Sequence, residues 1–130
     1  MIKFIRIADM KTVFSGIQPS GLVHLGNLLG AINNWVKLSD GNSKNYFCIV
    51  DLHSLTGLPN KNDLKKSIND TLKVLIASGI NLKTSVIYTQ SNLQEHAYLS
   101  WILSNFCQVG ELQRMTQFKE KASSFGTHSG

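Results

Sequence analysis

Residues 13–30, VFSGIQPSGLVHLGNLLG, combine residue types that could bind a phosphate group. A run typical of a β-strand leads through a loop with Gly16, Pro19 and Gly21 to residues 24–27, HLGN, and then to an apolar segment with helical spacing. At a helix start the backbone N–H groups have no partner within the helix, and the helix dipole favours negative charge. Glycines permit close backbone approach or positive φ, and proline stiffens the turn. The segment predicts a nucleotide-binding site without indicating which nucleotide.

Two widespread phosphate-binding patterns do not occur in this segment. The dinucleotide fingerprint needs G-x-G-x-x-G after the first strand, whereas the glycines here stand at positions 16, 21 and 26. The P-loop pattern, which ends in Lys followed by Ser or Thr, is also missing. Residues 24–27 instead read H-x-G-N, at the point where a nucleotidyl-transfer enzyme of the HIGH type has H-x-G-H.

The elements that must position these residues alternate between strand and helix. Three strand–helix units in series predict an α/β fold, namely a three-stranded parallel sheet with flanking helices and strand order 3-2-1. This is the first half of a Rossmann-like (HIGH-type) nucleotide-binding fold. We expect an N-terminal extension at 1–11, the half-fold at 12–122, and a loop-like end at 123–130. Strands are predicted at 12–17, 46–52 and 85–89, and helices at 27–38, from 60 or 62 to about 79, after the capping boxes of 91–95, and at 111–122.

Composition places the chain among ordinary globular proteins. Its hydrophobic content of 42% and charged content of 16% are typical of that class, and no apolar run reaches the length of a membrane span. The net charge of +5 fits a polyanionic partner, although scattered lysines also fit an ordinary basic surface. The apolar surroundings of Cys48 and Cys107 predict buried free thiols in a reducing compartment. The spacing of Cys48, Asp51 and His96 matches no zinc pattern, so no resident metal is expected.

The longer motifs resemble the tryptophanyl-tRNA synthetases of the bacterial and organellar type, which are class I synthetases. The resemblance covers residues 12 to about 122 and rests on FSGIQPSGLVHLGNLLGAINNWV, YFCIVDLHSLT, QSNLQEH and GELQRMTQFKEKA. It implies that tryptophan attacks Mg²⁺-ATP to give tryptophanyl-adenylate, and that the acyl group then passes to tRNA(Trp). It further implies a homodimer as the full-length enzyme, no membrane association, and a cytoplasmic location or, alternatively, the mitochondrial matrix.

The same resemblance assigns residues to the nucleotide. Gln18, Pro19 and Ser20 match the loop over ATP, and Gly26 lets the adenine lie against the backbone. Asn27 matches a residue that binds ATP and can also cap the helix. The imidazole of His24 matches a donor to the phosphate in the transition state. The alternatives are a simple turn for the loop and a surface position for His24.

The remaining site residues match the amino-acid pocket and the leaving group. Phe14 and Val50 match apolar walls for an indole, and His53 lies just beyond the second strand; core packing is the alternative for the first two. Lys121 matches a lysine directed at the pyrophosphate, with a solvated side chain as the alternative. The catalytic residues implied are thus His24, Asn27 and Lys121.

Other family features do not occur in the sequence. The signature K-M-S-K-S, the acidic residue that recognises the indole N–H, and the domain that reads the anticodon are missing. The sequence therefore predicts the amino-terminal part of a longer enzyme, with at most partial activity of its own. A catalytically inactive fragment that binds ATP, RNA or a subunit is the alternative, and a different H-x-G-H nucleotidyltransferase is a remote third.

Overall fold

The computed structural model describes residues 10–21, 23–116 and 118–119. The chain divides into two compact units, Met1–Leu93 and Gln94–Gly130. The first unit contains the sheet and its connecting helices. Lys121 and the end of the helix predicted at 111–122 lie outside the described residues.

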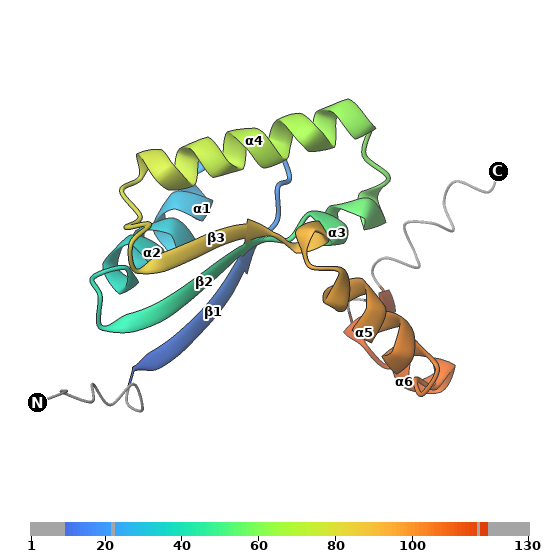
Figure 1. Ribbon diagram of the computed structural model, residues 1–130. Coiled ribbons are helices and arrows are strands. Elements are labelled where there is room, and N and C mark those ends of the chain that lie inside the picture. The colour runs from blue at the N-terminus through green and yellow to red at the C-terminus, as the bar shows by residue number, and fades with distance from the viewer. Residues whose placement is uncertain (1–9, 22, 117, 120–130) are drawn as a thin grey trace, which may run out of the picture. The chain divides into compact units, whose positions relative to one another are not determined.

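A parallel sheet forms the centre of the first unit. Its strands β1 (Lys11–Ile17), β2 (Ser43–Ile49) and β3 (Ser85–Thr89) lie side by side in the order β1-β2-β3 (Figure 1). Both pairs are parallel, and the register aligns Gly16 with Cys48 and Cys48 with Tyr88. The predicted strand number, direction and order are confirmed.

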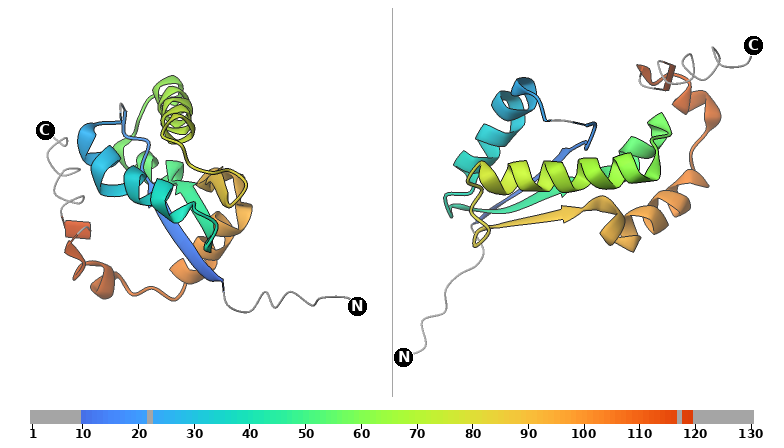
Figure 2. Two further views of the ribbon diagram at one scale, coloured as in Figure 1. Left: turned by 90° about the vertical axis from the view of Figure 1, so that its left-hand side faces the viewer. Right: turned by 90° about the horizontal axis from the view of Figure 1, so that it is seen from above.

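The connecting helices of the first unit lie on one face of this sheet (Figures 1 and 2). Because the strands follow one another in one direction across the sheet, right-handed crossovers must place the connecting helices on the same face. The helical segments of this unit are α1 (Leu25–Asn27), the π-helical turn η2 (Leu28–Ile32), α2 (Asn33–Leu38), α3 (Asp51–Ser54), η3 (Leu55–Gly57), α4 (Lys61–Ala77) and η4 (Gln90–Asn92). The second unit contains α5 (Gln94–Ser104) and α6 (Val109–Leu112). Among the described residues, no helix is both long enough and apolar enough to cross a membrane.

The hydrophobic core lies between the sheet and these helices. The indole of Trp35 stacks on the ring of Phe47 with the ring centroids 4.4 Å apart and the planes within 1° of parallel. This contact fixes α2 against β2. The core consists of Ile17, Ile32, Trp35, Phe47, Ile49, Leu75 and Ile80.

The other face of the sheet is covered less. Phe14, Tyr46 and Val86 point to it from the three strands and are 64%, 40% and 52% exposed. The first residues of β2 therefore alternate between buried and exposed, so the strand is covered on one face only there. Cys48 is buried on this face, as predicted, whereas Cys107 is exposed, so the prediction for that thiol is wrong.

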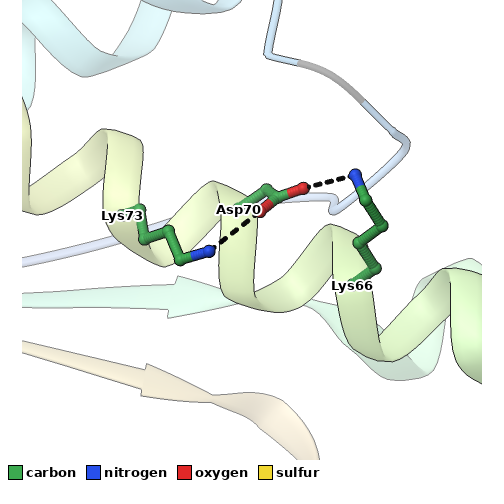
Figure 3. Close-up of polar contacts among 3 residues, drawn as sticks. All are labelled: Lys66, Asp70 and Lys73. Atoms are coloured by element: carbon green, nitrogen blue, oxygen red, sulfur yellow. Dashed lines mark hydrogen bonds and ion pairs between the residues drawn. The ribbon is translucent and has the colours of Figure 1, made fainter.

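Helix α4 shows how local sequence sets an element. The side chain of Asn60 accepts the Asn62 N–H at 2.8 Å and so caps its start, and Gly79, with φ of +93°, follows its end. On its outer face Asp70 accepts from Lys66 at 2.8 Å and from Lys73 at 3.3 Å (Figure 3).

Several predicted boundaries differ from the structure. The strand expected to end at 52 ends at Ile49, because the Val50 N–H makes the last bond, 2.9 Å to the Ile17 carbonyl, and the chain then turns into α3. An apolar run cannot by itself separate a buried strand from a short helix. On α4 the apolar side chain of Ile76 is 49% exposed, whereas the polar Thr71 is buried.

At the amino ends of the strands, buried polar side chains form hydrogen bonds with one another and with the backbone. The Asn45 amide donates to the Leu38 carbonyl at 2.9 Å and to the Ser85 hydroxyl at 3.3 Å, and its oxygen accepts from the Ser43 hydroxyl at 2.8 Å. These bonds join α2, β2 and β3 at the end of the sheet opposite the candidate site. We conclude that Asn45 serves the fold.

Candidate functional site

The loop after β1 starts at the carboxyl end of the sheet, where open parallel sheets bind ligands. Pro19 is buried, whereas Gln18 and Ser20 are exposed, and the Ser20 N–H donates to the Gln18 carbonyl at 3.0 Å. Gly21 has a φ of +100°, which explains why glycine stands there. The loop therefore presents the polar side chains of Gln18 and Ser20 on a stiffened backbone.

His24 caps the helical segment that follows the loop. Its ring Nδ1 accepts the Gly26 N–H at 3.1 Å, and the Asn27 side-chain oxygen accepts the His24 N–H at 3.3 Å. This is a capping box built from His24 and Asn27. Because Nδ1 is an acceptor, the neutral imidazole has its proton on Nε2. The same geometry leaves the Asn27 amide group as a donor, so both side chains offer N–H groups at a helix start.

Gly26 is required by the position of the His24 ring. A Cβ atom at residue 26 would lie 3.0 Å from both Cε1 and Nδ1 of His24. A side chain there would require the imidazole that caps the helix to shift by a few tenths of an ångström. From the sequence, Gly26 was expected to leave room for adenine. In the structure it also leaves room for the His24 ring.

Val50 lies at the end of β2 and packs against β1. A Cβ atom on Gly16 would be 2.9 Å from the Val50 Cγ1 atom. Gly16 therefore creates the space that Val50 occupies, on the same face of β1 as Phe14. Gly16 was not among the predicted pocket residues, although a glycine inside a strand signals close approach.

The turns after β2 and β3 are joined by two polar contacts. The His53 Nδ1 atom lies 3.3 Å from the Gln90 side-chain oxygen. The Asp51 carboxylate accepts the Ser91 N–H at 3.0 Å, and Asp51 is only 6% exposed. The sequence singled out His53 but considered Asp51 only as a metal ligand. An acidic residue directly after a buried strand was the available signal.

Cys48 and Tyr88 lie in register beside Gly16. Burial raises the pKa of the Cys48 thiol, and the negative charge of Asp51 adds to this effect, while a hydrogen bond from Tyr88 opposes it. Burial likewise raises the pKa of the Tyr88 hydroxyl, as does its hydrogen bond with Cys48. Both groups stay protonated at neutral pH, so the sheet here presents an uncharged surface next to Phe14.

A cavity of about 350 Å³ lies between the loop and the start of α4. Gln18, Pro19 and Ser20 line one side, and Ser54 and Asp63 are among the residues of the other. The structure thus brings the three predicted loop residues to one cavity, and the other predicted site residues that the structure describes are not part of its lining. The Ser54 hydroxyl is buried and has no hydrogen-bond partner among the described residues. Within the same residues, no three His, Cys, Asp or Glu side chains gather as metal ligands.

The chain is similar to proteins of one family. The family model described as tRNA synthetases class I (W and Y) matches residues 9–130. The tryptophan–tRNA ligase of Oceanobacillus iheyensis is 49% identical over 113 residues, which are 87% of this chain and 34% of that protein. The ligase of Clostridium tetani is 45% identical over 118 residues, 91% of this chain and 35% of that protein. The chain therefore spans about a third of the length of these curated relatives.

Solved structures show the same similarity in the fold. Tryptophanyl-tRNA synthetase from Mycoplasma pneumoniae superposes with a TM-score of 0.80 and 36% identity, over 88% of this chain and 34% of that one. The enzyme from Campylobacter jejuni complexed with ADP and tryptophan gives 0.79 and 33%, over 87% and 35%. The likeness confirms the predicted first half of a Rossmann-like fold.

Proposed function

Because the chain belongs to the family of class I tRNA synthetases for tryptophan and tyrosine, we propose that the protein activates L-tryptophan with ATP and transfers it to tRNA(Trp). The observation that carries the proposal is the capping box at a helix start, in which the Gly26 N–H donates to the imidazole of His24 and the Asn27 side chain accepts the His24 backbone N–H. Tryptophan rather than tyrosine is favoured by the relatives, which are tryptophan–tRNA ligases at 49% and 45% identity.

In the first step an oxygen of the tryptophan carboxylate attacks the α-phosphorus of ATP. The bond from that phosphorus to the bridging oxygen breaks, and pyrophosphate leaves with the Mg²⁺ that arrived with the nucleotide. His24 donates its Nε2–H to a phosphate oxygen as charge develops, and the Asn27 amide donates beside it. Donors fixed before the reaction stabilise such charge without reorganisation.

The loop and the distant lysine complete the nucleotide site. Gln18 and Ser20 reach the ribose and phosphates from a backbone stiffened by Pro19. Gly26 leaves room for the adenine as well as for the His24 ring. Lys121 neutralises the leaving pyrophosphate. In the second step a ribose hydroxyl of tRNA(Trp) attacks the acyl carbon and AMP leaves.

The amino acid occupies the uncovered face of the sheet at its carboxyl end. Phe14 and Val50 supply apolar walls for the indole, and His53 lies at the rim. The uncharged thiol of Cys48 and hydroxyl of Tyr88 suit an apolar ring better than a charged group would. We further propose a homodimer as the full-length enzyme, in the cytoplasm or alternatively in the mitochondrial matrix.

Charging of tRNA tests the proposal. The full product of the gene should esterify labelled tryptophan, and not tyrosine, onto a tRNA(Trp) transcript in the presence of Mg²⁺-ATP. The chain alone is expected to bind ATP and to support at most weak adenylate formation. Charging with tyrosine in place of tryptophan, or none with either, would overturn the proposal. Binding of ATP, RNA or a subunit without chemistry would leave the non-catalytic binding fragment as the function.

A further inference from the structure

Asp51 makes an unusual contact for an acidic residue of this chain. Its carboxylate is buried and accepts the backbone N–H of Ser91, which lies 40 positions further along the chain. By contrast, Asp40 accepts from its neighbour Asn42, and Asp70 pairs with lysines of its own helix. A carboxylate taken out of water is costly unless it is hydrogen-bonded, so the Ser91 contact has an energetic reason to persist.

Helix α3 depends on such contacts for its position. It has four residues, and no side chain caps its start. A helix of this length is not stable by itself in water. Two polar contacts join α3 to η4, one between Asp51 and Ser91 and the other between His53 and Gln90. Both contacts join the turn after β2 to η4, which directly follows β3.

The residues placed by α3 are those of the proposed amino-acid pocket. Val50 immediately precedes Asp51 and packs on Gly16, and His53 follows two positions later. A displacement of α3 would therefore move one wall and the rim of the pocket together. The loop at Gln18 and the cap at His24 belong to other segments and have no hydrogen bond to α3 among the described residues, and α3 shares the cavity beside the loop through Ser54.

We propose that Asp51 is a positioning residue for the amino acid, which holds α3 on η4 so that Val50 and His53 keep the shape of the tryptophan pocket. The inference rests on the proposed function and deepens it. Loss of the contact raises KM for tryptophan and leaves KM for ATP nearly unchanged. A purely structural role would instead lower the amount of folded protein without separating the two substrates.

Two pairs of variants in the full gene product test this, with tryptophan-dependent ATP–pyrophosphate exchange as the assay. Asp51→Leu removes the acceptor, whereas Asp51→Asn keeps an oxygen in its place. Ser91→Pro removes the N–H donor and also fixes the backbone φ, whereas Ser91→Ala keeps the donor. Asp70→Asn, at a half-buried carboxylate on the same chain that pairs only within its own helix, is the control for loss of charge.

The expected result is a rise of about tenfold or more in KM for tryptophan in Asp51→Leu and Ser91→Pro, with KM for ATP within about twofold of wild type. Asp51→Asn, Ser91→Ala and Asp70→Asn should stay within about threefold of wild type for both. Amide hydrogen exchange at Ser91 should accelerate in Asp51→Leu and much less in Asp51→Asn, which gives a readout that needs no turnover.

Two results would overturn the inference. One is equal KM values for tryptophan in Asp51→Leu, Ser91→Pro and wild type. The other is a parallel rise for both substrates. If Asp51→Leu does not fold, the Ser91→Pro and Ser91→Ala pair decides by the same criterion. Absence of ATP–pyrophosphate exchange in the wild-type protein would count against the proposed function. It would not count against the Ser91 contact, because amide hydrogen exchange still measures that contact.

Discussion

A Cβ atom on Gly16 would lie 2.9 Å from Cγ1 of Val50. Strand β1 therefore has a glycine at the position against which Val50, directly after β2, packs. Real Cβ atoms essentially never approach another atom this closely, so a side chain at position 16 would require Val50 to shift. Their contact forms the part of the sheet surface next to Phe14.

Gly16→Ala should impair both folding and the amino-acid pocket. The added methyl overpacks the site, which typically costs about 1–3 kcal/mol of unfolding free energy. KM for tryptophan should rise because Val50 must move. Chemical denaturation and pyrophosphate exchange measure the two effects.

The double variant Gly16→Ala with Val50→Ala should recover much of the lost stability, because it removes the atom that is too close. Gly30→Ala is the matched control, since a Cβ atom there has no neighbour within 4 Å. In a helix this change favours folding by up to about 1 kcal/mol. Equal stability of Gly16→Ala and wild type would contradict the geometry.

His24→Asn should separate the two roles of the capping residue. Asparagine keeps a side-chain acceptor for the helix start but lacks the Nε2–H donor, so stability should stay close to wild type while the exchange rate falls by a factor of about 10²–10³. His24→Ala should lose the same rate and, in addition, about 1 kcal/mol of stability. Thermal unfolding and exchange on the same preparations check both. An Asn variant with wild-type exchange would remove His24 from the mechanism.

Asn45→Ala should destabilise the first unit without affecting tryptophan recognition. The change leaves the Leu38 carbonyl and the Ser43 and Ser85 hydroxyls without this amide, and unpaired buried groups cost about 1–3 kcal/mol. Denaturant titration should show the loss, with KM for tryptophan unchanged in the folded fraction. Asn34→Ala, at an exposed asparagine, should change stability by less than about 0.5 kcal/mol.

The two cysteines should differ in reactivity. Cys107 is exposed and Cys48 is fully buried, so an aromatic disulfide reagent should modify Cys107 in the native chain and Cys48 only after unfolding. Quantification of released thiolate with and without denaturant measures this. Rapid native modification of Cys48 would contradict the burial.

The raised pKa of Cys48 also gives stability a pH dependence. The folded chain holds the thiol proton more tightly than the unfolded chain, because burial disfavours the thiolate. The resulting stabilisation is fully present below the unfolded pKa of about 8.5 and is lost as pH rises through the higher folded value. The stability difference between wild type and Cys48→Ala should therefore shrink as pH rises through this range. A difference independent of pH would show that Cys48 does not titrate in the way described.

The sequence predicted the fold well because its signals were local and repeated. Glycine, asparagine and proline mark the turns, and apolar periodicity marks the strands and α4. It predicted the end of β2 poorly, because Val50 and Leu52 look like strand residues, and only the Val50 bond to Ile17 shows where the ladder stops.

The sequence indicated only part of the candidate site, because its signals were local. Short motifs indicated Gln18, His24 and Asn27, whose hydrogen bonds described above are to residues close to them in the chain. Gly16 and Asp51 were missed as site residues because their partners, Val50 and Ser91, are distant in sequence. Such pairs become visible only when the register of the sheet is known.

The most direct test of the central claim is ATP–pyrophosphate exchange by the full gene product, measured with tryptophan, with tyrosine and without an amino acid. We expect exchange that requires tryptophan and that falls in His24→Asn without loss of folded protein. Exchange that is equally fast with tyrosine, or that does not depend on His24, would contradict it.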